Sequence, residues 1–150
     1  MTKWLVLFLA LTASGPVLAQ AVKQPPPAQC AVGPATTLTP APDERAKQWL
    51  SLIDDSNYGE AWRQAGAFLH GQVDTGKFQT QVSGVREPLG AMATRNIKDI
   101  KMSKTLPGMR DGQYAVVQFD SSFAHKASAV ETVTLTLDNG AWTVVGYHIN

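Results

Sequence analysis

The chain has little cysteine, little net charge and no apolar run long enough to cross a membrane. Its 150 residues include one cysteine, Cys30, which excludes a disulfide framework, a cysteine-based zinc site and an iron–sulfur cluster. The formal net charge is +1, so no electrostatic attraction to nucleic acid or anionic lipid is expected. With 44% hydrophobic and 17% charged residues, the composition is that of a folded protein with one core.

The chain starts with the pattern of a secretory leader. Lys3 precedes an apolar run from Trp4 to Ala13, then a helix-breaking Gly-Pro and the small-residue pattern Val17-Leu18-Ala19. This order predicts a signal peptide over residues 1–19, cleaved before Gln20. The run of 10 apolar residues is shorter than the about 20 that a transmembrane helix needs. We therefore expect an exported protein, periplasmic or secreted, with no transmembrane segment after cleavage.

Residues 20–42 are rich in proline, with three consecutive prolines at 25–27. Proline fixes φ and removes a backbone donor, so this segment is predicted to be an extended, disordered linker. Cys30 lies within it and serves either as an intermolecular disulfide partner or as an unpaired thiol. A single folded domain is predicted over residues 43–150.

The first half of this domain has helical periodicity. Residues 43–55 carry an apolar stripe, and Asp43 suits the positive end of that helix. A second helix is predicted from Tyr58 to Gly71, where Asn57 and Glu60 have capping-box spacing. A third is predicted over residues 75–85.

After Gly90 the apolar period changes from about 3.6 to 2, which predicts strands. Alternation is clear in residues 114–119, 129–137 and 141–149, and residues near 100–106 form a further strand. Asp138-Asn139-Gly140 predicts a tight hairpin. Helices followed by four antiparallel strands predict an α+β fold with the helices packed on one face of the sheet.

Several short motifs occur along the domain in an order that can be compared with known families. They are Trp49-Leu50-x-Leu52-x-Asp54, Tyr58-x-x-Ala61-Trp62, Arg86-x-Pro88-Leu89-Gly90, Leu106-Pro107-Gly108, Ser122-Phe123, Glu131-Thr132-Val133 and Trp142-x-Val144-x-Gly146-Tyr147. In this order the chain resembles the exported bacterial family known as domain of unknown function 4019. It resembles more weakly the nuclear transport factor 2-like superfold. That resemblance implies a curved four-stranded sheet forming a cystatin-like or nuclear transport factor 2-like cone, with a pocket and a tendency to dimerise through the sheet.

One carboxylate stands out among the strands. Glu131 shares the parity of Val133 and Leu135, so it falls on the apolar face, where a charge needs a partner, a hydrogen bond or a proton. Arg86, at the end of the third helix, is its expected partner. Such a pair serves either as a structural clamp or as the polar group of a pocket. Alternatively, Glu131 lies near the end of its strand and is exposed to solvent at the rim of the sheet.

The candidate pocket is expected to combine this pair with nearby aromatic and imidazole side chains. The set is Glu131, Arg86, Tyr58, Trp62, Trp142 and His148. Asp54 is expected to order the turn between helices, and the basic residues from Arg95 to Arg110 are expected to protect a sheet edge. No catalytic residue, metal site or cofactor is expected, because nucleophile, phosphate-binding and metal-ligand motifs are absent from the sequence.

Three functions remain open at this level. The first is a non-enzymatic exported domain that binds a small ligand or an envelope protein. The second is a small pocketed enzyme with Glu131 as its acid or base, and an open cavity beside Glu131 would favour it. The third is a homodimeric structural module whose interface is the sheet.

Overall fold

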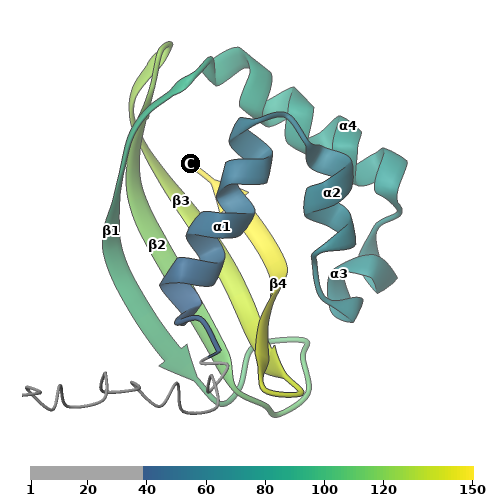
Figure 1. Cartoon of the computed structure of the whole chain (residues 1–150). Helices are drawn as coiled ribbons and strands as arrows, with labels where there is room; N and C mark the ends of the chain where they lie inside the picture. Colours follow the sequence, from purple (N-terminus) through teal and green to yellow (C-terminus); the bar gives the residue numbers. More distant parts are fainter. Residues whose placement is uncertain (1–38) are drawn as a thin grey trace, which may run out of the picture. The chain divides into compact units, whose positions relative to one another are not determined.

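The computed structural model describes residues 39–150, in which four α-helices precede four antiparallel strands. The helices are α1 (Pro42–Asp54), α2 (Tyr58–Arg63), α3 (Ala67–Gln72) and α4 (Thr75–Arg86), followed by a 3₁₀ turn, η1 (Glu87–Leu89). The strands are β1 (Met92–Ser103), β2 (Tyr114–Phe123), β3 (Lys126–Asp138) and β4 (Ala141–Ile149), in the spatial order β1-β2-β3-β4. The helices lie on one side of a curved sheet (Figure 1), which confirms the predicted α+β class. The predicted signal peptide, most of the linker and Cys30 lie outside the described residues.

Helix α1 supplies the centre of the core. Pro42 and Asp43 occupy its first turn. The missing N–H of proline costs nothing there, because first-turn amides have no partner within the helix. The carboxylate of Asp43 is favourable at the positive end of the helix dipole. Its buried stripe is Ala46, Trp49, Leu50 and Ile53, as predicted. Trp49 is fully buried and donates from Nε1 to the Ala61 carbonyl at 2.8 Å, so its polar atom is satisfied inside the core. This stripe packs with Val117, Phe119, Val133, Leu135 and Val144 of the sheet.

The prediction of one helix from Tyr58 to Gly71 is wrong, because the chain breaks into α2 and α3. At the break, Ala65 forms a parallel bridge with Val144, and the Gly66 amide donates to the Val144 carbonyl at 2.7 Å. A Cβ at Gly66 would lie 2.9 Å from Thr143 Oγ1, so only glycine allows this close approach without a shift. The pairing with the sheet therefore outweighs the helical stripe.

The helix caps also differ from the prediction. Asn57 precedes α2 but makes no side-chain capping bond, so the capping box is not formed. Asp74 caps α4 instead, and its side chain accepts from the Lys77 amide at 2.9 Å. Helix α4 then ends at Arg86, and Gly90 (φ 74°) turns the chain into β1.

The strands pair in simple hairpins interrupted by register shifts. Asn139 and Gly140 both have positive φ, as the predicted two-residue hairpin between β3 and β4 requires. The pairing of β1 with β2 shifts between Ile97 and Asp99, and that of β3 with β4 shifts opposite Thr134 and Leu135. Each shift changes which face the following residues occupy.

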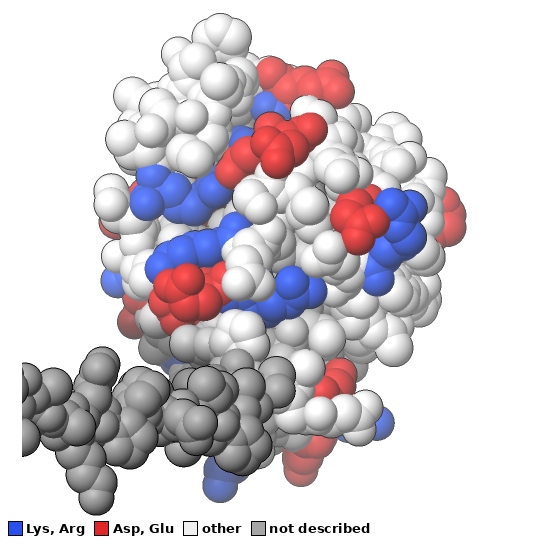
Figure 2. Space-filling model, viewed as in Figure 1, with Lys and Arg blue, Asp and Glu red and all other residues white. Residues whose placement is uncertain are grey.

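Charges of both signs are interspersed on the visible face (Figure 2), which matches the near-neutral net charge. None of the helices between residues 39 and 150 is long and apolar enough to cross a membrane.

Candidate functional site

The inner face of the sheet carries a buried carboxylate, Glu131 on β3. Its residue exposure is 0%, as the strand parity predicts. Its Oε2 accepts from Arg95 Nε at 2.7 Å and from Ser121 Oγ at 2.6 Å. Its Oε1 accepts from Tyr147 OH at 2.8 Å and from Arg95 Nη2 at 3.1 Å. Both oxygens are therefore satisfied by donors from β1, β2 and β4.

The cation that neutralises Glu131 is Arg95, so the predicted pairing with Arg86 is wrong. Arg95 also donates from Nη1 to Asp54 Oδ2 at 2.6 Å and from Nη2 to Asp54 Oδ1 at 3.0 Å. Arg86 reaches the same carboxylate, with Nη2 2.6 Å from Asp54 Oδ1. The four side chains Arg86, Asp54, Arg95 and Glu131 thus form one chain of alternating charge with no net charge, which we call the ionic network.

The ionic network joins α1, α4, β1 and β3. Asp54 was expected to order the turn after α1, but its carboxylate belongs to the ionic network. Arg95 is directed inward, because it lies opposite Ser121 on the inner face of β2. It is therefore not an edge-protecting charge, in contrast to Lys98, which pairs with exposed Asp120.

The pKa values of Glu131 and Tyr147 are shifted because both groups are buried next to the ionic network. Burial raises the pKa of Glu131, but hydrogen bonds from Arg95 and Ser121 and the charge of Arg95 outweigh it, so its pKa lies below the usual 4.5. Burial and the adjacent Glu131 charge raise the pKa of Tyr147 above its usual value. At neutral pH Glu131 is therefore ionised and Tyr147 protonated.

Arg86 is 5% exposed, and its guanidinium lies over the Phe123 ring, with Cζ 4.3 Å from the ring centroid. Its Nε and Nη1 are buried and have no hydrogen-bond partner among the described residues. Arg86 is thus held by one ion pair and one aromatic face.

The other predicted pocket residues do not converge with Glu131. Tyr58 and Arg86 line a hollow of about 290 Å³ between the end of α1 and η1. Trp142 is 9% exposed within the core, and Trp62 packs against that core while donating from Nε1 to the Val73 carbonyl at 3.0 Å. His148 is exposed and faces away from the core, because the shift in β4 reverses the expected parity.

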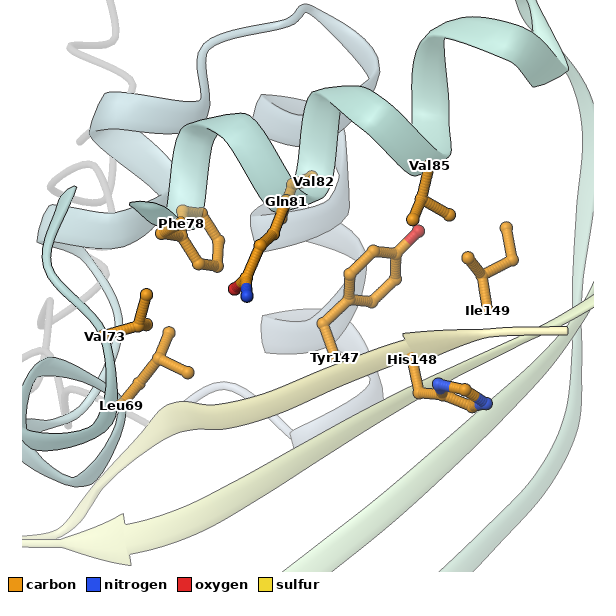
Figure 3. A pocket seen from close by; sticks show the side chains of 9 residues that line it. All are labelled: Leu69, Val73, Phe78, Gln81, Val82, Val85, Tyr147, His148 and Ile149. Atoms are coloured by element: carbon orange, nitrogen blue, oxygen red, sulfur yellow. The ribbon is translucent and has the colours of Figure 1, made fainter. Parts of the chain in front are cut away.

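A different pocket lies between α4 and β4 (Figure 3), with a volume of about 300 Å³. Its walls are mostly aliphatic or aromatic: Leu69, Val73, Phe78, Val82, Val85 and Ile149. Gln81 extends from α4 into the space above β4, and Tyr147 rises from β4 towards α4. His148 borders the pocket, but its ring lies on the opposite side of β4. We call this space the α4–β4 pocket.

Sequence reasoning missed Arg95, Ser121, Gln81 and the inward direction of Tyr147. Ser121 could have been found, because it shares the parity of Phe119 and Phe123 on β2. Gln81 lies on α4 one residue before buried Val82, and no feature of the sequence distinguishes it from a surface glutamine.

The arrangement limits the chemistry available to these residues. Glu131 has no exposed surface, and both of its oxygens are occupied by donors from Arg95, Ser121 and Tyr147. Within residues 39–150, no group of three or more His, Cys, Asp or Glu side chains is placed to hold a metal ion.

The comparison with protein-family models identifies a family and assigns it no activity. The model of a family described as protein of unknown function (DUF4019) matches residues 45–147. No curated protein matches the chain.

Proposed function

Because the chain belongs to the DUF4019 family, whose description assigns no activity, we propose from the site itself that it is an exported, non-enzymatic domain that binds a small ligand in the α4–β4 pocket. The observation that carries this proposal is the pocket's form. Its volume of about 300 Å³ and its apolar walls with a few polar groups match the usual character of small-molecule sites.

The geometry of Glu131 favours binding over catalysis by this carboxylate. An acid or base must reach the atom whose proton it moves, and Glu131 is fully enclosed by Arg95, Ser121 and Tyr147. The role that fits it is a clamp that fixes the sheet beneath the pocket. We further propose that the curved sheet and its helices form a cone of the nuclear transport factor 2-like type.

Export is supported by the order of charged, apolar and small residues before Gln20. Cell fractionation tests it directly: the mature protein should be periplasmic or secreted and should begin near Gln20. A chain lacking residues 2–19 should stay in the cytoplasm, and equal distribution of the two chains would contradict export.

Native mass spectrometry of the protein recovered from its own cells tests the binding function. We expect an added mass of a few hundred daltons that is lost in Val85→Trp, because an indole at this half-exposed position fills the pocket. The control is Lys98→Ala, at an exposed position of β1 that does not line the pocket. An adduct that survives Val85→Trp would place the ligand elsewhere.

One observation favours a second candidate function, a homodimer. Ile97, Ile100 and Met102 of β1 are 43%, 40% and 56% exposed, on a strand at the edge of the sheet. They lie opposite inner-face residues of β2, so a second copy would cover this face of the sheet. Sedimentation under reducing conditions should then show a dimer that Ile100→Lys dissociates, and a monomer at high concentration would exclude it.

A further inference from the structure

The walls of the α4–β4 pocket carry no formal charge. None of its nine lining residues is Lys, Arg, Asp or Glu. With the His148 ring directed away, the polar side-chain groups of the lining are the Gln81 amide and the Tyr147 hydroxyl. Gln81 is an exposed residue whose amide projects into the pocket, so it can offer both a donor and an acceptor to a ligand.

The Tyr147 hydroxyl already uses its proton in a hydrogen bond to Glu131. Its single proton is donated to Glu131 Oε1 at 2.8 Å, so towards a ligand it acts only as an acceptor. Immediately behind it lies the negative charge of Glu131. The two cations near it are both paired with carboxylates: Arg95 with Glu131 and Asp54, and Arg86 with Asp54.

These contacts discriminate by ligand charge. An anionic head group in the pocket would lose hydration and find no cation among the lining residues, since the cations behind Tyr147 are already paired with carboxylates. An ammonium group would also lose its hydration without meeting an acidic side chain of the pocket. A hydroxyl or amide group carries no charge and can form hydrogen bonds in the pocket, because it can accept from Gln81 and donate to Gln81 or Tyr147.

We infer that the ligand is an uncharged amphiphile, a short hydrocarbon with one hydroxyl or amide group that Gln81 holds. This inference rests on the proposed function. A volume of about 300 Å³ equals roughly ten water-sized groups of about 30 Å³ each, which suits a chain of about eight carbons with one head group.

Three probes with the same chain length test the charge discrimination: octan-1-ol, octanoate and octylamine, titrated into the full chain at neutral pH. Calorimetry measures affinity, and tryptophan fluorescence provides a second signal. Trp49 contacts the lining residues Phe78 and Tyr147, with ring centroids 6.3 and 5.5 Å away. We expect octan-1-ol to bind at least tenfold more tightly than either charged probe.

Two variants separate the head-group contact from the pocket. Gln81→Leu keeps the size of the side chain and should weaken octan-1-ol about three- to tenfold, the effect of one neutral hydrogen bond. Val85→Trp should abolish binding of all three probes. Lys98→Ala, at an exposed position of β1 outside the pocket, should leave each affinity unchanged.

The outcomes distinguish this inference from the function on which it rests. Octanoate or octylamine binding as tightly as octan-1-ol, with loss in Val85→Trp, would overturn the ligand class and leave the pocket as a binding site. An unchanged affinity in Gln81→Leu would remove the role of Gln81. No binding of any probe, or binding that persists in Val85→Trp, would overturn both.

Discussion

Replacing Arg95 with methionine should be among the most destabilising single changes in the domain. Methionine keeps much of the length of the side chain but removes the only cation that contacts Glu131 among the described residues. Glu131 would then retain two hydroxyl donors, Ser121 and Tyr147, and would be a fully buried carboxylate without a counter-charge. Breaking a buried ion pair in this way costs about 3–5 kcal/mol.

Asp54 limits the damage on the other side of Arg95. It is 17% exposed at its side chain and keeps the ion pair with Arg86, so it loses one of two cations. Most of the cost therefore arises at Glu131. A domain of this size is stable by about 5–15 kcal/mol, so the variant should remain folded at low temperature but unfold at much lower urea concentration.

The pH dependence gives a more specific signature. In the wild type, the pKa of Glu131 lies below its usual 4.5, so its contribution to stability is present above that value and is lost as the pH falls through the lowered pKa. Without Arg95, burial dominates and raises the pKa of Glu131 above its usual value. Its contribution in the variant is then present at acidic pH and is lost as the pH rises through the raised pKa. The free-energy difference between the two proteins should therefore shrink from pH 7 to pH 4.

Urea unfolding followed by tryptophan fluorescence measures both effects. The matched control is the double variant Arg95→Met/Glu131→Gln, which removes the stranded charge but keeps an amide to bond with Ser121 and Tyr147. It should be more stable at pH 7 than Arg95→Met alone by at least about 1 kcal/mol. A cost for Arg95→Met of less than about 1 kcal/mol, unchanged between pH 7 and pH 4, would refute the account of the ionic network.

Three further changes test individual contacts, all by urea unfolding. Tyr147→Phe removes the hydrogen bond to Glu131 and should cost about 1.5–3 kcal/mol, whereas Tyr58→Phe, used as its control, should cost under about 0.5. Gly66→Val should cost about 1–3 kcal/mol through its clash with Thr143, whereas Gly71→Ala, which meets no atom within 4 Å, should be neutral or stabilising. Asp74→Ala removes the α4 cap and should cost about 1 kcal/mol, and Asn57→Ala, which removes no capping bond, should cost less than half as much. In each pair, equal effects of the two substitutions would contradict the contact assigned.

Much of the fold could be predicted because local patterns agree with the tertiary packing. The stripe of α1, the strand alternation and the Asn139-Gly140 turn each favour the structure that forms. Parity predicts that Glu131 lies on the apolar face, and this holds because β3 keeps its alternation from Glu131 to Leu135 while the extra residue of the shift lies in β4.

The errors occur where the period of two is broken. In β4 the register shift inserts a residue after Val144, so Val145 is also buried, Tyr147 turns inward and His148 turns out. A parity count through residues 141–149 therefore assigns Tyr147 and His148 to the wrong faces. The break between α2 and α3 has a similar origin, because a long-range pairing of Ala65 with Val144 overrides a local helical stripe.

The partner of Glu131 could not be read from the sequence for a different reason. Parity states which face a residue occupies but not which cation on other elements lies beside it. Arg95 is 36 residues from Glu131 and two strands away, and it reaches the carboxylate only because β2 places the small Ser121 between them. Arg86 is nearby but is directed to Asp54.

The placement of Tyr147 connects the ionic network with the α4–β4 pocket. Tyr147 lines the pocket while its hydroxyl donates to Glu131, so the network helps to position a pocket residue. A carboxylate used as a general acid or base works best with a pKa near the operating pH, whereas the pKa of Glu131 is lowered and all its acceptor positions face donors. The same four hydrogen bonds that make Glu131 a poor proton carrier make it a rigid support for Tyr147. Under the proposed function, the charge of Glu131 supports the pocket wall through Tyr147, and the uncharged lining groups contact the ligand.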